Sequence, residues 1–259
     1  MIKSVFRIFL LLLLPQFILG ESSENLAAGF TVVIDAGHGA HDSGALGKNS
    51  KEKDLALKIA LKLRDKLKAN GVKVVMTRST DKFLPLYERI GLANKVKADL
   101  FISIHCNSMP LNKRNRASIR GTETFVSGFG RLDEQDIALR ENASILLEKD
   151  YKKNYAGYDP KDPESYIILS LMKNAFRTQS IQFASLIQKE YKKSGRIDRG
   201  VHEKSLAVLA RAAMPAVLTE VGFISSPAEE QYMRSAAGQN EIVTDLSNAV
   251  LAYKKSVKK

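Results

Sequence analysis

Apolar residues recur along the chain in short β-branched runs that alternate with longer segments of helical period. Residues 31–35 form a continuous β-branched run, which is typical of a buried strand. In the next segment apolar side chains recur at every fourth position, which predicts an amphipathic helix over 55–67 that Asn70-Gly71 ends. Residues 72–77 then return to the strand pattern. The first part of the chain is therefore expected to fold as a strand, a helix and a second strand.

The same alternation continues towards the middle of the chain. A helix is predicted to begin after Pro85 and to extend over 86–96, followed by strands at 99–104 and 121–127. Strands that alternate with amphipathic helices indicate βαβ units and a largely parallel sheet.

The pattern changes after Gly128 and Gly130, where the chain becomes polar. The elements expected beyond this point are a helix-permissive stretch at 132–149, a loop at 151–165, helical turns at 166–175, a helix from 176 to Gly195, strands at 205–210 and 216–220, and a terminal helix over 242–253. We therefore predict a single α/β domain. Its mostly parallel twisted sheet of about six strands is flanked by helices, with an inserted helical segment near 130–175.

The N-terminal residues have the pattern of a cleaved secretory signal. Lys3 and Arg7 precede an apolar run that closes at Gly20, so we expect a signal peptide at 1–20, a linker at 21–29 and a catalytic domain at 30–256. The alternative is an uncleaved membrane anchor. The run is about a dozen residues and contains Pro15, whereas a membrane-spanning helix needs ~20. We accordingly expect export to the periplasm with no stable membrane insertion after cleavage.

The positive charge of the chain narrows the classes of partner. The formal net charge is +12, and loss of Lys3 and Arg7 with the signal would leave +10. A basic surface suits polyanions such as nucleic acid, anionic lipid headgroups or a carboxylate-bearing wall polymer. Export argues against nucleic acid, so the charge fits an acidic substrate outside the cytoplasm without identifying it. Cys106 has no cysteine partner, which excludes an internal disulfide. Its alternative role as a nucleophile is not favoured, and we expect a monomer held together by burial alone.

Polar clusters follow three of the predicted strands. Gly37-His38-Gly39 follows the first strand, His105 the third and Glu220 the last, while Glu52 stands at the start of the first helix. In an α/β sheet the active site lies outside the carboxyl ends of the strands. We therefore expect these side chains to meet at one edge of the sheet.

Two imidazoles and one carboxylate are the ligand set of an open catalytic zinc site. We predict that His38, Glu52 and His105 bind one Zn²⁺ per chain and leave a fourth position for water. Glu220 is placed to accept the proton of that water and to pass it to a leaving nitrogen. Other interpretations remain open at this point: Glu52 as an ordinary helix N-terminal carboxylate, and Glu220 as a buried partner of a lysine. His41 and His202 are interpreted as hydrogen-bonded structural residues.

Ordered blocks of residues carry a family resemblance over about Phe30 to Tyr253. The blocks are Val33–Gly39 with Asp42 and Gly44-Ala45, Glu52-Lys53, Thr77-Arg78 with Asp81, Leu86 through Glu88-Arg89 with Ala93-Asn94, Ala98–His105 with Asn107, and Pro215–Leu218 leading into Glu220–Ser225. In this order the chain resembles the zinc-dependent N-acetylmuramoyl-L-alanine amidases of the Gram-negative, septum-splitting type.

The resemblance implies zinc binding by His38, Glu52 and His105 and catalysis by Glu220. It also implies hydrolysis of the amide between N-acetylmuramic acid and L-alanine in peptidoglycan, for wall remodelling and daughter-cell separation. The chain departs from the family at Ala40, where a second glycine is usual, and at His202, where a basic residue is usual.

The inserted segment resembles an element that plugs the active site in some Gram-negative relatives. In this chain Arg140–Ser144 lies in the matching stretch. We therefore predict that 131–175 is autoinhibitory, that Glu141 occupies the open zinc position, and that an activator protein displaces the inserted helix. The alternative is a plain surface helix.

Two other functions compete with the amidase interpretation. The same ligand set serves a zinc peptidase or deacetylase that acts on another bond of wall polymers. A catalytically inactive wall-binding regulator is the candidate from a different class, and the complete set of four site residues argues against it.

Overall fold

The computed structural model describes residues 29–128, 136–160, 162, 165, 168 and 175–257. The expected signal peptide at 1–20 and nearly all of the linker at 21–29 lie outside the described residues. So do residues 129–135 and most of the helical turns expected at 166–175. No helix within the described ranges combines the length and apolar character needed to cross a bilayer.

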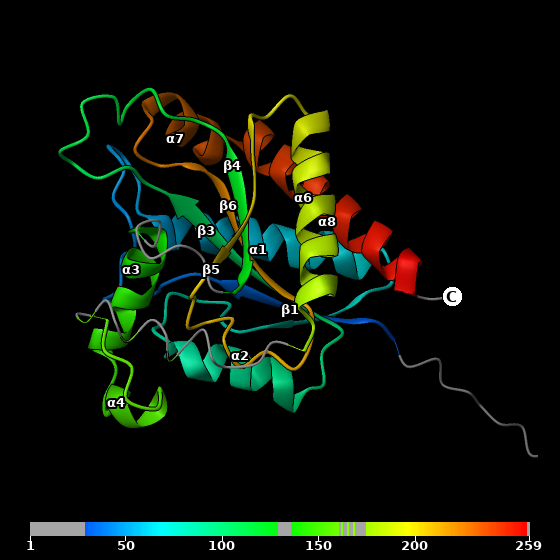
Figure 1. Cartoon of the computed structure of the whole chain (residues 1–259). Helices are drawn as coiled ribbons and strands as arrows, with labels where there is room; N and C mark the ends of the chain where they lie inside the picture. Colours follow the sequence, from blue (N-terminus) through cyan, green and yellow to red (C-terminus); the bar gives the residue numbers. More distant parts are fainter. Residues whose placement is uncertain are drawn as a thin grey trace, which may run out of the picture.

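Among the described residues, six strands form one sheet in the order β2-β1-β3-β6-β4-β5 (Figure 1). They are β1 (Thr31–Ala36), β2 (Lys73–Met76), β3 (Leu100–Asn107), β4 (Thr122–Ser127), β5 (Asp198–Lys204) and β6 (Ala216–Phe223). Neighbours among β2, β1, β3 and β6 pair in parallel, β4 is antiparallel to β6, and β5 is parallel to β4. The predicted α/β class with a mostly parallel sheet is confirmed.

Helices cover both faces of this sheet. On one face α1 (Glu52–Ala69), α6 (Arg177–Lys193) and α8 (Ala236–Val257) pack together, and their apolar stripes meet in one core (Figure 1). On the other face α2 (Leu86–Lys95) packs with the segment 206–214 in a second core. This second core also takes side chains from α3 (Asp136–Asn142) and the 3₁₀ helix η2 (Ala143–Leu147), which precede α4 (Tyr151–Asn154).

The strand predicted at 205–210 is wrong. That apolar run is buried, but it forms turns that contribute to the second core. The strand is β5 at Asp198–Lys204, which directly precedes this run. The pattern misled because β5 lies at the edge of the sheet, where half-exposed polar residues replace an apolar run. Helix α7 (Pro227–Arg234) was not predicted, and α4 lies within the stretch expected to be loop.

A buried ion pair lies near the end of β1. The Asp35 carboxylate accepts hydrogen bonds from Arg89 Nη1 at 3.0 Å, Thr77 Oγ1 at 2.6 Å and Ser103 Oγ at 2.6 Å. Burial opposes ionisation of Asp35, yet Arg89 and the two hydroxyl groups hold its pKa below the usual range. The network joins β1 to β3 and to α2, and therefore fixes the strand from which the next turn departs.

Loss of the Asp35 carboxylate is expected to destabilise the fold strongly. Asp35→Ala leaves Arg89 buried without its counter-ion, which costs about 3–5 kcal/mol of unfolding free energy. The matched control is Asp65→Ala, which removes the partner of Arg64 in an exposed pair and is expected to cost about 0–1 kcal/mol. Urea unfolding measures both, and equal losses for the two variants would contradict the role given to Asp35.

Candidate metal centre and active site

His38 lies in a tight turn directly after β1. Its backbone has a φ of 60°, which is uncommon for a non-glycine residue and requires support from its surroundings. Two buried guanidinium groups provide that support: Arg78 donates to the carbonyls of Ala36 and Gly37, and Arg89 donates to those of Ala36 and His38. These bonds hold the turn that carries the imidazole.

The Asp42 carboxylate orients the ring of His38. Asp42 Oδ2 lies 2.9 Å from His38 Nδ1, so the other ring nitrogen, Nε2, faces the centre of the site. Such a carboxylate–imidazole pair is a common way to fix the tautomer of a metal-binding histidine. The Asp42 pKa is lowered because, although burial opposes ionisation, the hydrogen bond with His38 outweighs it.

Glu52 is the first residue of α1, and the preceding loop brings it to the same place. The carboxylate accepts a hydrogen bond from Ala45 N at 2.8 Å and another from Cys106 N at 2.9 Å. The loop is held in turn by Glu230 of α7, which accepts bonds from the backbone of residues 48 and 49 and from Ser50 Oγ. An element that the sequence pattern did not predict thus positions a predicted ligand.

His105 stands near the end of β3 and points into the same centre. Its ring lies so close to Gly37 that a Cβ at that position would come within 2.5 Å of the ring. The absence of a side chain at Gly37 is therefore a steric requirement of the site. In the sheet His105 pairs with Glu220 of β6, which places the two functional side chains on neighbouring strands.

Four buried side chains converge: His38, Glu52, His105 and Glu141. One ligand atom from each lies within 4.8 Å of all the others. Glu52 Oε1 is 3.2 Å from His38 Nε2 and 3.0 Å from His105 Nδ1, while Glu141 Oε2 is 2.8 Å from His105 Nδ1. Although other ligand atoms lie this close, His38 Nε2 and Glu141 Oε2 are buried and make no hydrogen bond of acceptable geometry among the described residues.

This geometry fits a metal ion. Buried polar atoms normally have hydrogen-bond partners, so two orphaned atoms aimed at one centre call for a ligand there. Burial would lower the pKa of both imidazoles, but Glu52 outweighs that effect at His38, and Glu141 raises the pKa of His105 to about 10. Imidazole and carboxylate donors together suit a divalent cation of the zinc type.

Glu220 lies fully buried beside this centre. Its Oε1 atom accepts a hydrogen bond from Arg140 Nη2 at 3.1 Å, and its Oε2 atom has no partner among the described residues. Burial raises the pKa of Glu220 well above its usual value, against the opposing charge of Arg140. A carboxyl group of this kind can exchange a proton with a reacting group near neutral pH.

Arg140 and Glu141 enter the site from α3. Besides Glu220, the Arg140 guanidinium donates to Asn107 Oδ1 at 3.1 Å and to the Ser108 carbonyl at 2.8 Å. Asn107 is held by Glu123 Oε2 of β4 at 2.7 Å. One dipeptide of the inserted segment therefore contacts both the ligand cluster and Glu220.

The remaining candidates lie elsewhere. The His41 ring stacks near Phe83 with centroids 4.4 Å apart, and exposed His202 bonds to the Arg199 carbonyl at 2.8 Å. Cys106 is fully buried, and burial raises the pKa of its thiol well above the usual value, which disfavours a thiolate nucleophile.

Asp42, Arg140 and Asn107 have no individual role that the sequence pattern predicts. Asp42 carried a signal, since it stands four residues after His38, but its loop geometry was needed to show that it reaches the ring. Arg140 carried none beyond its place next to Glu141, because its contacts come from a tertiary approach of α3 to β3 and β6.

Comparisons with known proteins agree with this arrangement. Residues 32–252 match the N-acetylmuramoyl-L-alanine amidase family. N-acetylmuramoyl-L-alanine amidase AmiA of Escherichia coli (strain K12) is 32% identical over 232 residues, which cover 86% of this chain and 75% of AmiA.

Solved structures extend the similarity to the fold. The catalytic domain of CwlV, an N-acetylmuramoyl-L-alanine amidase from Bacillus (Paenibacillus) polymyxa var. colistinus, superposes with a TM-score of 0.64 at 30% identity, covering 87% of this chain and 98% of that one. An N-acetylmuramoyl-L-alanine amidase from Clostridium difficile 630 gives a TM-score of 0.66 at 29% identity, covering 88% and 98%. The chain therefore belongs to the N-acetylmuramoyl-L-alanine amidase family of peptidoglycan hydrolases.

Proposed function

We propose that this amidase is a zinc enzyme in which His38, Glu52 and His105 hold the metal and Glu220 handles the proton. The observation that carries the proposal is the convergence of buried, partly orphaned ligand atoms on one centre next to a buried carboxyl group. Zinc in such a site acts as a Lewis acid and makes water nucleophilic at neutral pH. The substrate is the amide between the lactyl group of N-acetylmuramic acid and L-alanine.

The protein groups have separate tasks in this reaction. Asp42 and the backbone bonds of Arg78 and Arg89 keep the His38 ring in place, so the ligands need little reorganisation. Glu220 accepts a proton from water and returns it to the nitrogen of the leaving L-alanine, which departs as an amine. Its raised pKa suits both steps, because the group must take up and release the same proton.

Export to the periplasm and a role in daughter-cell separation complete the proposal. Both rest on the N-terminal pattern and on the resemblance to septum-splitting amidases.

The rival reactions, peptide cleavage and deacetylation by the same ligand set, are distinguished by mass spectrometry of digested sacculi. Only an amidase releases intact stem peptides from intact glycan chains, and shortened stem peptides would contradict the proposal.

The inserted segment supports an autoinhibited resting state. Glu141 Oε2 approaches both imidazoles, so it takes the position that water needs, and Arg140 pairs with the carboxylate that must accept a proton. Asn142 anchors the segment through bonds with Tyr158 OH, the Ser205 carbonyl and Ala207 N. An activator protein that withdraws α3 would open both positions at once.

A second anchor joins the segment to α2. Glu148 accepts a hydrogen bond from Leu86 N at 2.8 Å, and Tyr155 OH accepts one from Tyr87 N at 2.9 Å. These side chains satisfy two of the free N–H groups at the start of α2. Deleting the whole insertion would uncap that helix, so single substitutions at the site test autoinhibition more cleanly.

The purified chain is expected to contain one zinc per molecule by elemental analysis. His38→Ala and His105→Ala each remove a ligand and should abolish stoichiometric zinc. Asp42→Asn should weaken zinc affinity by about 10–100-fold, since it disturbs the orientation of His38. His202→Ala is the matched control at an exposed histidine and should leave the zinc content unchanged. Full zinc occupancy in His38→Ala would refute the ligand assignment.

Glu220→Gln is expected to keep zinc and to lower wall cleavage by about 10²–10⁴-fold, because an amide side chain cannot shuttle the proton. Dye release from labelled sacculi measures the rate. The assay is carried out in the Glu141→Ala background, which removes any requirement for activation. Glu88→Gln, at an exposed carboxylate on α2, serves as the control. Cleavage at the parental rate in Glu220→Gln would remove Glu220 from the mechanism.

Glu141→Ala is expected to raise basal cleavage by at least about tenfold, the factor that 1.4 kcal/mol of lost ligation produces. The reason is that the carboxylate no longer competes with water for the centre. Lys149→Ala, an exposed substitution in the same segment, should leave the basal rate unchanged. If Glu141→Ala stays at the basal rate while binding zinc normally, the segment is a surface element and not a plug.

A further inference from the structure

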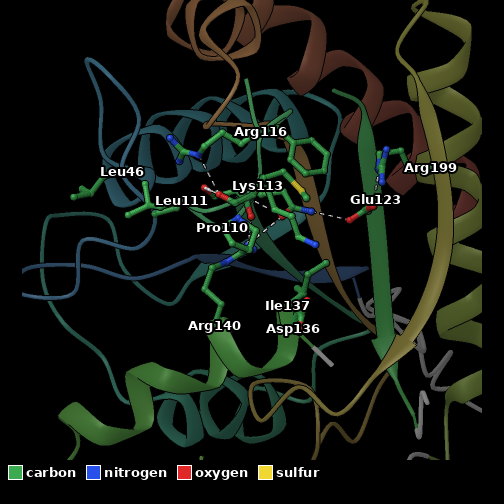
Figure 2. A pocket seen from close by; sticks show the side chains of 15 residues that line it. Leu46, Pro110, Leu111, Lys113, Arg116, Glu123, Asp136, Ile137, Arg140 and Arg199 are labelled. Atoms are coloured by element: carbon green, nitrogen blue, oxygen red, sulfur yellow. Dashed lines mark hydrogen bonds and ion pairs between the residues drawn. The ribbon is translucent and has the colours of Figure 1, made fainter. Parts of the chain in front are cut away.

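A cavity of about 720 Å³ lies beside Glu220 (Figure 2). Its wall includes Asn107 and Phe223 at the ends of β3 and β6, Glu123 of β4 and the start of α3. The rest of the wall comes from the long connection 108–121 between β3 and β4. The cavity is open to solvent in this structure, in which α3 covers the metal centre. A ligand can therefore reach the cavity before α3 is withdrawn.

The connection 108–121 has an unusual charge. It contains four basic residues and no acidic residue, and the basic residues are Lys113, Arg114, Arg116 and Arg120. Lys113 and Arg116 line the cavity, whereas Arg114 and Arg120 are exposed and do not. Figure 2 shows Lys113 and Arg116 on the side of the cavity opposite Asp136 and Ile137 of α3.

The cations of the cavity wall differ in their partners. Arg199 pairs with Glu123 at 2.7 Å, and Arg140 pairs with Glu141 and Glu220. Lys113 and Arg116 have no carboxylate partner among the residues that the structure describes, and Arg116 Nε makes only a 3.4 Å contact with the Met109 carbonyl.

Two carboxylates line this cavity: Glu123 pairs with Arg199, and Asp136 belongs to α3. The charge of Asp136 opposes that of Lys113 and Arg116 only while the occluding segment is in place. Withdrawal of α3 would remove Asp136 and Arg140 together, and Lys113 and Arg116 would stay in the wall to face an anionic ligand.

The position of the cavity indicates on which side of the site the leaving peptide lies. A second cavity, of about 340 Å³, is lined by His38, Asp42, Gly44 and Leu147, and Ala45 and Arg140 line both cavities. Glu220 contacts two residues of the wall of the first cavity: it pairs with Glu123 in the sheet and accepts a hydrogen bond from Arg140. The proton from Glu220 goes to the leaving amine, so the leaving peptide must extend towards the first cavity. This step rests on the proposed role of Glu220.

We infer that the cavity beside Glu220 binds the stem peptide, and that Lys113 and Arg116 bind its free carboxylate. The chemistry is complementary, because the second residue of the stem is a glutamate linked through its side chain, which leaves its α-carboxylate free next to L-alanine. Two cations that have no carboxylate partner among the described residues can accept this anion without breaking an ion pair of that part of the chain. In some cell walls this carboxylate is amidated, and Lys113 and Arg116 would then make the enzyme discriminate between the two forms.

Binding of a soluble product tests the inference without any requirement for turnover. The full-length chain is titrated with L-Ala-γ-D-Glu-L-Lys and with the same tripeptide carrying D-isoglutamine, and both affinities are measured by NMR. The wild-type chain should bind the acidic form about tenfold more tightly, the ratio expected for a charge-assisted hydrogen bond at a partly exposed site. Lys113→Ala combined with Arg116→Ala should bind both tripeptides equally.

The same connection supplies the matched control. Arg114→Ala removes an identical charge from an exposed position outside the cavity, so it should keep the tenfold preference. Lys113→Arg combined with Arg116→Lys should restore it. An equal preference in the alanine double variant and the wild type, or no binding of the acidic tripeptide at millimolar concentration, overturns the inference.

The outcome is independent of the proposed catalytic role. If Glu220→Gln cleaves normally but the acidic tripeptide is still preferred in a manner that depends on Lys113 and Arg116, the proton-transfer proposal fails and the carboxylate site stands. If cleavage is lost as proposed but no preference exists, only the carboxylate site fails.

Discussion

The buried pair of Asp35 and Arg89 is the interaction on which the site depends. A charge enclosed in the interior is costly unless it is paired and hydrogen-bonded, and here two hydroxyl groups and two backbone carbonyls complete the set. The carbonyls belong to the turn that carries His38. The same hydrogen bonds therefore stabilise the buried charge of Arg89 and hold the turn that positions His38.

The proposed metal centre draws its ligands from parts of the chain that meet only in the folded protein. His38 follows β1, His105 ends β3 and Glu52 begins α1, whose preceding loop is held by Glu230 of a distant helix. Gly37 lets the two imidazoles approach, since a side chain there would collide with His105. Rigid elements supply most of this geometry, which is what a preorganised catalytic centre requires.

The inserted segment acts on the centre through two adjacent side chains of opposite charge. Glu141 approaches the imidazoles and Arg140 approaches Glu220, so each side chain pairs with a group to which we assign a role in the reaction. The same segment caps α2 and contributes to the second core. Its placement thus depends on ordinary packing and capping, whereas its effect falls on the site. Arg140 also lines both cavities beside the centre.

The sequence by itself determined the α/β class, five of the six strands and the approximate positions of His38, Glu52, His105 and Glu220. These follow from local periodicity and from the rule that functional residues stand at strand ends, and both are properties of neighbouring residues. Which strand forms the β5 edge of the sheet depends on tertiary contacts. Strand β5 is held by pairing with β4 and has no apolar pattern of its own. Tertiary contacts likewise bring Arg140 to Glu220, and within the described ranges they give Lys113 and Arg116 no carboxylate partner, since contacts between distant segments leave no periodic trace in the chain.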